Sequence, residues 1–158
     1  FILATQPEVA RQLSENVDDD RFVTRFVEEV LRIDPPVRGI TRMTTQEVEV
    51  GGVLLPTGAH LLLLYASAND DETEFPAPRE FNVERPNLGR HFAFGGGVHR
   101  CAAAALARIE LKIAAREIAR RMTDIRLAIP LEEIKYLPTL ATHTIANLEL
   151  TFSRRQLD

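Results

Sequence analysis

The residue with the most distinctive chemistry is Cys101, the only cysteine among 158 residues. The segment before it, residues 94–100, reads FGGGVHR, and a long run of helix-forming residues follows. A thiolate at the start of a helix is stabilised by the helix dipole and by free backbone N–H groups. Glycines also permit unusual turns and let a flat ligand approach the backbone closely. The segment therefore indicates a reactive or metal-binding thiolate, although a lone cysteine is more often an inert buried thiol.

Composition excludes several classes of protein. The chain is 45% hydrophobic and 27% charged, as in an ordinary globular domain, and its net charge of -4 argues against a general nucleic-acid binder. One cysteine cannot form an internal disulfide, which favours a reducing compartment, and we expect the cytoplasm. The longest apolar run, residues 61–66, falls well short of the roughly 20 residues needed to span a bilayer, so we expect no membrane anchor.

Local signals predict two helices early in the chain, after residues 1–4, which read as the tail of another helix. Thr5 and Glu8 have the spacing of a capping box, with Pro7 in the first turn, so a helix is expected over residues 7–15. A second helix is expected over residues 21–33, begun by Asp20 and ended by the prolines that follow Asp34. Its expected apolar face consists of Phe22, Val23, Phe26, Val27, Val30 and Ile33, with Glu29 at the edge.

The middle of the chain changes to strand patterns. Residues 46–50 alternate, glycine-containing turns follow, and residues 61–64 are continuously apolar, as in a strand buried on both sides. A small antiparallel sheet is predicted, then a short helix within 67–72. The irregular stretch at 75–97 is long enough to suggest a functional loop. Finally, a long helix is predicted over residues 102–122 and two strands over 125–128 and 147–152.

Residues 94–101 resemble the cysteine-ligand loop of the cytochrome P-450 family, Phe-x-x-Gly-x-x-x-Cys. Phe94, Gly97 and Cys101 match its fixed positions, and His99 is the basic residue common before the cysteine. The chain departs from the family at Ala103, where glycine is usual, at the contact between helix and haem. The resemblance implies that Cys101 is the axial ligand of haem iron and that Phe94 packs near its sulfur.

The resemblance also suggests the remaining haem contacts. Arg42 lies where the family commonly places an arginine for a haem propionate, and His99 is expected to serve the second propionate. Backbone amides from Gly95 to Cys101 are expected to point toward the sulfur and tune the iron's potential. Without the resemblance, Arg42 would be read as a solvated strand residue.

A second motif is the pair Glu29 and Arg32, three residues apart on one predicted helix face. Taken alone, such a pair is most often a solvated ion pair worth about 0.2–0.5 kcal/mol. The longer string at 28–36 resembles the family's Glu-x-x-Arg helix with its proline break, and Arg85 matches the arginine that joins the pair. By resemblance the three residues form a buried network that scaffolds the cysteine loop.

The resemblance implies one partial domain, residues 1–158, as the C-terminal, haem-binding portion of a bacterial-type cytochrome P-450. Its fold class is α+β, mainly helical, with a small antiparallel sheet and a long helix after the cysteine loop. The family's distal acid–alcohol pair lies outside this portion, so no catalytic residue is expected within the chain. Val37, Ile40 and Thr142 are expected to face the substrate, on segments 37–41 and 140–145.

The implied activity is a haem-thiolate monooxygenase that inserts one oxygen atom from O2 into a small apolar molecule. Haem b is the expected cofactor, with electrons from NAD(P)H through a ferredoxin-type donor. That activity is expected of a full-length chain, and for these 158 residues alone it stays open. Two alternatives are a truncated haem-binding module with weak peroxidase or sensor activity, and a structural domain without haem.

A docking surface for the acidic electron donor is a further hypothesis. Arg100, with the helix residues Arg108, Lys112 and Arg116, could present positive charge near the haem edge and steer the donor's approach. The alternative is an ordinary solvated helix face opposite Ile109 and Ile113.

Overall fold

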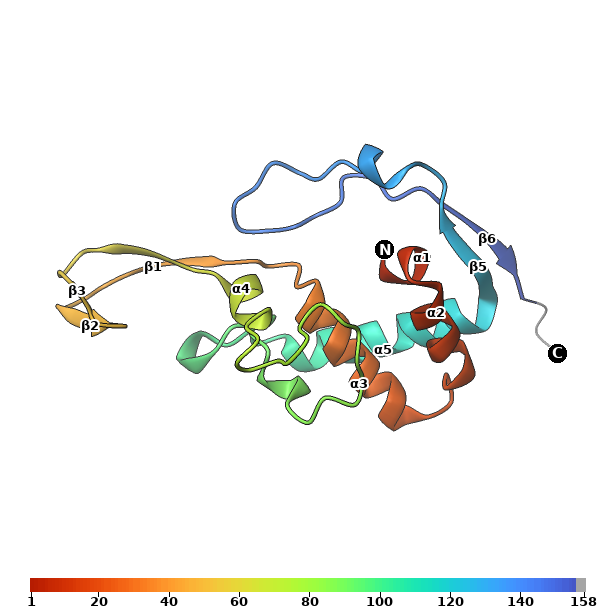
Figure 1. Ribbon diagram of the computed structural model, residues 1–158, viewed down its shortest axis with the longest axis horizontal. Coiled ribbons are helices and arrows are strands. Elements are labelled where there is room, and N and C mark those ends of the chain that lie inside the picture. Colours follow the sequence, from red (N-terminus) through yellow and green to blue (C-terminus); the bar gives the residue numbers. More distant parts are fainter. Residues whose placement is uncertain (156–158) are drawn as a thin grey trace.

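The computed structural model describes residues 1–155. This part of the chain contains five α-helices and three short antiparallel ladders, joined by loops. The elements are spread along one axis, with the β2–β3 hairpin at one end and the β5–β6 ladder at the other (Figure 1). The helices are α1 Ile2–Thr5, α2 Pro7–Glu15, α3 Asp20–Ile33, α4 Tyr65–Asn69 and α5 Ala104–Arg121, with single 3-10 turns η1 Leu88–Arg90, η2 Gly97–His99 and η3 Leu131–Glu133. The expected mainly helical α+β class is confirmed.

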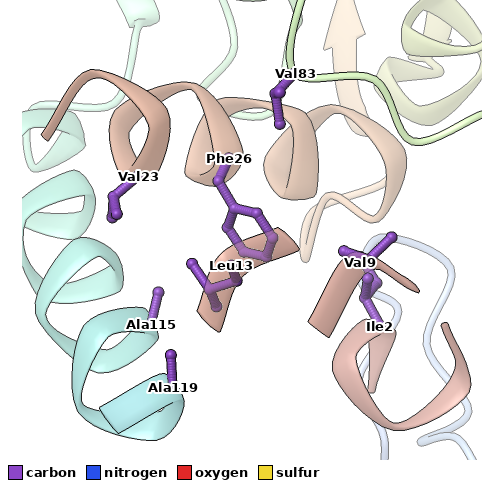
Figure 2. Close-up of a cluster of buried hydrophobic side chains, with 8 residues drawn as sticks. All are labelled: Ile2, Val9, Leu13, Val23, Phe26, Val83, Ala115 and Ala119. Atoms are coloured by element: carbon purple, nitrogen blue, oxygen red, sulfur yellow. The ribbon is translucent and has the colours of Figure 1, made fainter. Parts of the chain in front are cut away.

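Helix α3 organises the packing because its apolar face serves two clusters. Val23 and Phe26 join a core with residues of α1, α2, α5 and the loop residue Val83 (Figure 2). Val27 and Leu31, further along α3, pack with Ala93, and Phe94 covers that second cluster. Burying side chains of this size stabilises a fold by about 1.5–3 kcal/mol each. The second cluster attaches the start of the cysteine loop directly to α3.

The strands form separate two-stranded ladders. β1 (Ile40–Met43) pairs with β4 (His60–Leu63), and between them β2 (Val48–Val50) and β3 (Val53–Leu55) form a hairpin. The turn of this hairpin is Gly51-Gly52, whose φ angles of 58° and 79° suit glycine. β5 (Met122–Leu127) follows α5 directly and pairs with β6 (Leu150–Arg154). Each ladder is antiparallel, and the one small sheet expected in the middle of the chain consists of two separate ladders.

Three details of the sequence analysis were wrong. Thr5 does not cap α2, because its hydroxyl donates back to the Phe1 carbonyl within α1 and Gln6 occupies the cap position. Asp19, one residue before the expected Asp20, caps α3 by accepting hydrogen bonds from the amides of residues 21 and 22. The apolar run at 61–64 is not buried on both sides, since Leu62, Leu63 and Leu64 are 42–54% exposed.

Helix boundaries shifted only slightly from expectation. The limits of α2 agree with the prediction, α4 begins two residues earlier than the predicted segment, and α5 begins at Ala104 because residues 102 and 103 form a turn. None of the helices described in residues 1–155 combines the length and apolar character of a membrane span.

Candidate functional site

The cysteine loop is a series of tight turns that ends at Cys101. Gly95 and Gly97 adopt φ angles of 67° and 63°, a region that other residues avoid. The Gly95 amide donates to the Phe92 carbonyl at 2.8 Å, and the Cys101 amide donates to the Phe94 carbonyl at 2.9 Å. This last bond closes the loop, so the backbone position of Cys101 is tied to Phe94.

One side of the loop is packed and the other is open. A Cβ atom added to Gly95 would lie 3.2 Å from the Tyr65 hydroxyl oxygen, so α4 supports the loop closely there. A Cβ at Gly97 would meet nothing within 4 Å. Val98 is 98% exposed, and Cys101 is an exposed free thiol. The open side therefore presents the thiol to whatever group it binds.

The metal-ligating side chains near Cys101 fit a metal that already carries most of its ligands. Within residues 1–155, no three His, Cys, Asp or Glu side chains converge on a metal position. A site built on Cys101 would supply one sulfur, as in haem-thiolate proteins, where the macrocycle provides the equatorial ligands. Helix α5 begins three residues after Cys101, so its first backbone N–H groups, which lack partners within the helix, are near the loop.

Glu29, Arg32 and Arg85 meet in one fully buried cluster, with side chains 0%, 1% and 5% exposed. Arg32 binds the Glu29 carboxylate through two nitrogens, at 2.7 and 3.0 Å, and Arg85 Nε donates to the same carboxylate at 3.0 Å. The backbone amide of Asn82 adds a fourth donor at 2.9 Å. The charge of Glu29 is therefore well compensated inside the protein.

The two guanidinium groups also hold the irregular loop that follows α4. Arg32 donates to the carbonyls of Asn69 and Pro78, at 2.8 and 2.6 Å. Arg85 donates to the carbonyls of residues 76, 77 and 80. Apart from Asn69, the last residue of α4, these residues lie outside any helix or strand, and buried carbonyls need donors. The cluster thus replaces secondary structure in this part of the chain.

Asn69 connects that cluster to the cysteine loop. Its backbone carbonyl accepts from Arg32, and its side-chain oxygen accepts from the Phe92 amide at 2.6 Å. The Phe92 ring in turn stacks on Tyr65, with ring centroids 6.0 Å apart. A continuous set of contacts therefore runs from Glu29 to residue 92, two positions before Phe94.

A second carboxylate, 12% exposed, belongs to the preceding residue of α3. Glu28 accepts two hydrogen bonds from Arg108, at 2.6 and 3.0 Å, and one from His91 at 3.0 Å. Burial alone would raise the pKa of Glu28, but the hydrogen bonds from His91 and Arg108 and the charge of Arg108 outweigh it and hold the pKa at about 2. The same contact raises the pKa of Arg108 above its usual value. Glu28 is therefore ionised throughout the physiological range.

Glu28 and His91 were not among the site residues predicted from the sequence. A signal was present in the pair of adjacent glutamates at 28 and 29 and in a histidine three residues before Phe94. Adjacent helix residues point in different directions, so two glutamates in a row can reach two different loops. Only the folded chain shows that both of these loops lie beside α3.

The expected substrate-facing residues come partly together. Val37 and Thr142 form an isolated antiparallel bridge, and the Arg38 amide donates to the Ala141 carbonyl at 2.7 Å. Ile40 lies on β1 and pairs with Leu63 of β4. Segments 36–38 and 141–143 are thereby joined into one surface.

Arg42, the expected propionate ligand, lies on β1 opposite Leu61. Its guanidinium donates to the neighbouring carbonyl of Thr41, at 2.9 Å. In the described part of the chain it pairs with no carboxylate. His99 and Ala103 are exposed in the loop and in the turn before α5.

The helix residues of the proposed docking surface on α5 are paired with carboxylates. Lys112 and Arg116 bind Asp20 of α3 at 2.9 and 2.7 Å, and Arg108 binds Glu28. The alternative of a solvated face opposite Ile109 and Ile113 was wrong, because these two residues are 56% and 55% exposed. Helix α5 turns its basic residues toward α3, where acidic partners are present, and its isoleucines away from it.

The Cytochrome P-450 family model matches residues 1–122. Cytochrome P-450 144 of Mycobacterium tuberculosis is 38% identical over 150 residues, which is 95% of this chain and 33% of that protein. The 6-deoxyerythronolide B hydroxylase of Saccharopolyspora erythraea is 33% identical over 94% of this chain and 36% of its own length. The chain thus spans about a third of the curated relatives it matches.

Solved structures give the same result. Substrate-free Mycobacterium marinum cytochrome P-450 CYP150A6 superimposes with a TM-score of 0.90 at 33% identity, covering 98% of this chain and 39% of that one. The arrangement of helices and ladders is therefore that of a known fold across nearly the whole chain.

The buried cluster predicts a large effect of Glu29→Gln. The substitution leaves two buried guanidinium groups without a counter-charge, which typically costs about 3–5 kcal/mol of unfolding free energy. The matched control is Glu8→Gln, because Glu8 and Arg11 have the same spacing but are 61% and 56% exposed. Denaturant unfolding of the full-length protein should separate the two variants clearly. Equally small losses of unfolding free energy in the two variants would contradict this prediction.

The lowered pKa of Glu28 predicts a pH dependence of its contribution to stability. Because its folded pKa of about 2 is below the ordinary 4.5, the carboxylate stabilises the fold fully above pH 4.5, and this contribution is lost as pH falls toward 2. The full contribution is on the order of 2 kcal/mol once partial solvent screening is allowed for. Urea unfolding at several pH values should show the gap between wild type and Glu28→Gln narrowing below about pH 4.5. A constant gap would contradict this prediction.

Proposed function

The chain belongs to the cytochrome P-450 family, and we propose that it forms the haem-binding part of a monooxygenase, with Cys101 as the thiolate ligand of the iron. The observation that carries the proposal is the exposed thiol at the end of a closed glycine loop, with open space on one side. One relative, named as a hydroxylase, supports an oxidative reaction in general.

The proposed role of Cys101 is to hold the iron and donate electron density to it, which in haem-thiolate enzymes favours cleavage of the O–O bond. When bound, the haem supplies the redox-active iron at which dioxygen is activated. The protein's part is to keep the thiolate in one position. The Cys101 amide bond to the Phe94 carbonyl and the turns at Gly95 and Gly97 support that role.

The other haem contacts are proposed from residues that are free to make them. Arg42 carries a charge that no carboxylate among residues 1–155 neutralises, and His99 is exposed next to the cysteine. Both suit the two negatively charged propionates of haem b. Ala103, in the turn before α5, would lie against the macrocycle, where its methyl group is small enough for close approach.

We assign the Glu29 cluster a scaffolding role. Its guanidinium groups hold the loop after α4, and Asn69 relays that order to Phe92. The cluster is buried and lies away from the open side of the cysteine loop. This fits a structural role and not a catalytic one.

The proposed substrate is a small apolar molecule. Val37, Ile40 and Thr142 are the residues assigned to its site, and the bridge between Val37 and Thr142 would join two segments of the substrate wall. Electrons would come from NAD(P)H through a ferredoxin-type partner, and the expected compartment is the cytoplasm, where a single thiol stays reduced.

The proposal predicts that Cys101→Ser removes thiolate ligation, because an alcohol is a far poorer anionic ligand. In the full-length protein, the ferrous–CO complex of the wild type should show the red-shifted Soret band of thiolate-ligated haem, and the variant should lose it. Haem content measured independently distinguishes a changed ligand from lost haem. Survival of the red-shifted band in Cys101→Ser would refute the assignment.

A further inference from the structure

Helix α3 uses two adjacent carboxylates for two different tasks. Glu29 belongs to the scaffold described above, whereas Glu28 reaches the other way, to His91 before the cysteine loop and to Arg108 of α5. The His91 side chain is 1% exposed, Glu28 is 12% exposed and Arg108 is 25% exposed. Three residues from three segments therefore meet in a site that is largely closed to solvent.

The hydrogen bonds define the protonation of His91. Its Nδ1 accepts from the Ala93 amide at 3.1 Å, so this nitrogen carries no proton. The ring must then carry its proton on Nε2, which donates to Glu28 at 3.0 Å. The neutral ring thus fixes both the backbone at Ala93 and the carboxylate of Glu28.

Arg108 connects this group to the ring of Phe94. Its guanidinium carbon lies 4.4 Å from the centroid of the Phe94 ring, within the range of a cation–π contact. The bidentate bonds to Glu28 hold the planar guanidinium in place. Phe94 also packs against the cluster of Val27, Leu31 and Ala93. The ring therefore contacts both a fixed cation and an apolar core.

Phe94 is also the residue whose carbonyl accepts the Cys101 amide. A shift of Phe94 would move or break this bond, and with it the backbone that carries the thiol. The contacts form one path, from Glu28 through Arg108 and the Phe94 ring to the Cys101 amide.

We propose that Glu28, His91 and Arg108 form a positioning network for the thiolate ligand, acting through Phe94. This inference rests on the proposed function of Cys101. None of the three residues contacts Cys101 directly, so their role is to restrict its backbone. The network differs from the Glu29 scaffold because it acts on the first residue of the cysteine loop and on the helix that follows it.

The chain contains a matched control on the same helix. Arg116 lies two turns after Arg108, is 23% exposed and binds Asp20 of α3 at 2.7 Å. Both arginines are similarly exposed and link α5 to α3 through a carboxylate, which is 12% exposed in Glu28 and 69% exposed in Asp20. Only Arg108 contacts Phe94. Replacing each arginine by lysine keeps the charge but removes the planar, bidentate group.

The experiment uses the full-length holoenzyme in the reduced, CO-bound state. The rate at which the red-shifted thiolate band is lost in mild urea reports on ligand positioning, while far-ultraviolet circular dichroism reports on global unfolding. We expect Arg108→Lys to lose the band roughly tenfold faster than wild type, the factor expected for one charge-assisted hydrogen bond. Arg116→Lys should stay within about twofold of wild type. Equal rates of band loss in Arg108→Lys and Arg116→Lys would overturn the proposed positioning role.

His91→Asn provides an independent test if Arg108→Lys does not fold. An asparagine oxygen can accept from the amide two residues later, as His91 Nδ1 does, but it lacks the reach to Glu28. Faster loss of the band at unchanged helix content is expected, and wild-type kinetics would overturn the proposal. A wild type without the thiolate band would instead refute the proposed function itself, which distinguishes the two failures.

Discussion

The Glu29 carboxylate, buried between Arg32 and Arg85, is the constraint on which the rest of this structure depends. A buried charge is tolerated only when it is paired and hydrogen-bonded, and Glu29 is held by both guanidinium groups and by the Asn82 amide. The arginines then use their remaining donors on loop carbonyls. The irregular segment after α4 has no ladder or helix to bind its backbone carbonyls. Hydrogen bonds from the two charged guanidinium groups hold it instead.

The adjacent residue Glu28 extends the same principle toward the site. One carboxylate organises the loop after α4, and its neighbour organises the start of the cysteine loop through His91 and Arg108. The apolar face of α3 supports both, because Val27 and Leu31 form the surface on which Phe94 rests. Helix α3 thus combines core packing with support for the loop that carries Cys101.

Sequence patterns predicted the elements better than the contacts between them. Helices α2, α3 and α5 and the glycine turn at 51–52 follow from local propensities, which act within a few residues. Two Glu-x-x-Arg pairs show the limit of such reasoning. Glu8 with Arg11 is exposed and Glu29 with Arg32 is buried, and only the longer string around the second pair distinguishes them.

The sequence also did not predict which face of α5 packs against α3, for a related reason. Its apolar and basic residues both recur at helical spacing, so periodicity alone does not decide which set faces α3. Asp20 and Glu28 pair with Lys112, Arg116 and Arg108 on the side of α5 that faces α3, and Ile109 and Ile113 face outward. The cysteine motif was recognisable because its residues are close in sequence, whereas Glu28 is 63 residues from His91 and 80 from Arg108.

X-ray absorption at the iron edge of the full-length ferric protein tests the central claim most directly, since it reports the atoms bound to the metal without relying on activity. The account predicts one sulfur in the first coordination shell of the iron, lost when Cys101 is replaced. A first shell of nitrogen and oxygen alone in the wild type would contradict it.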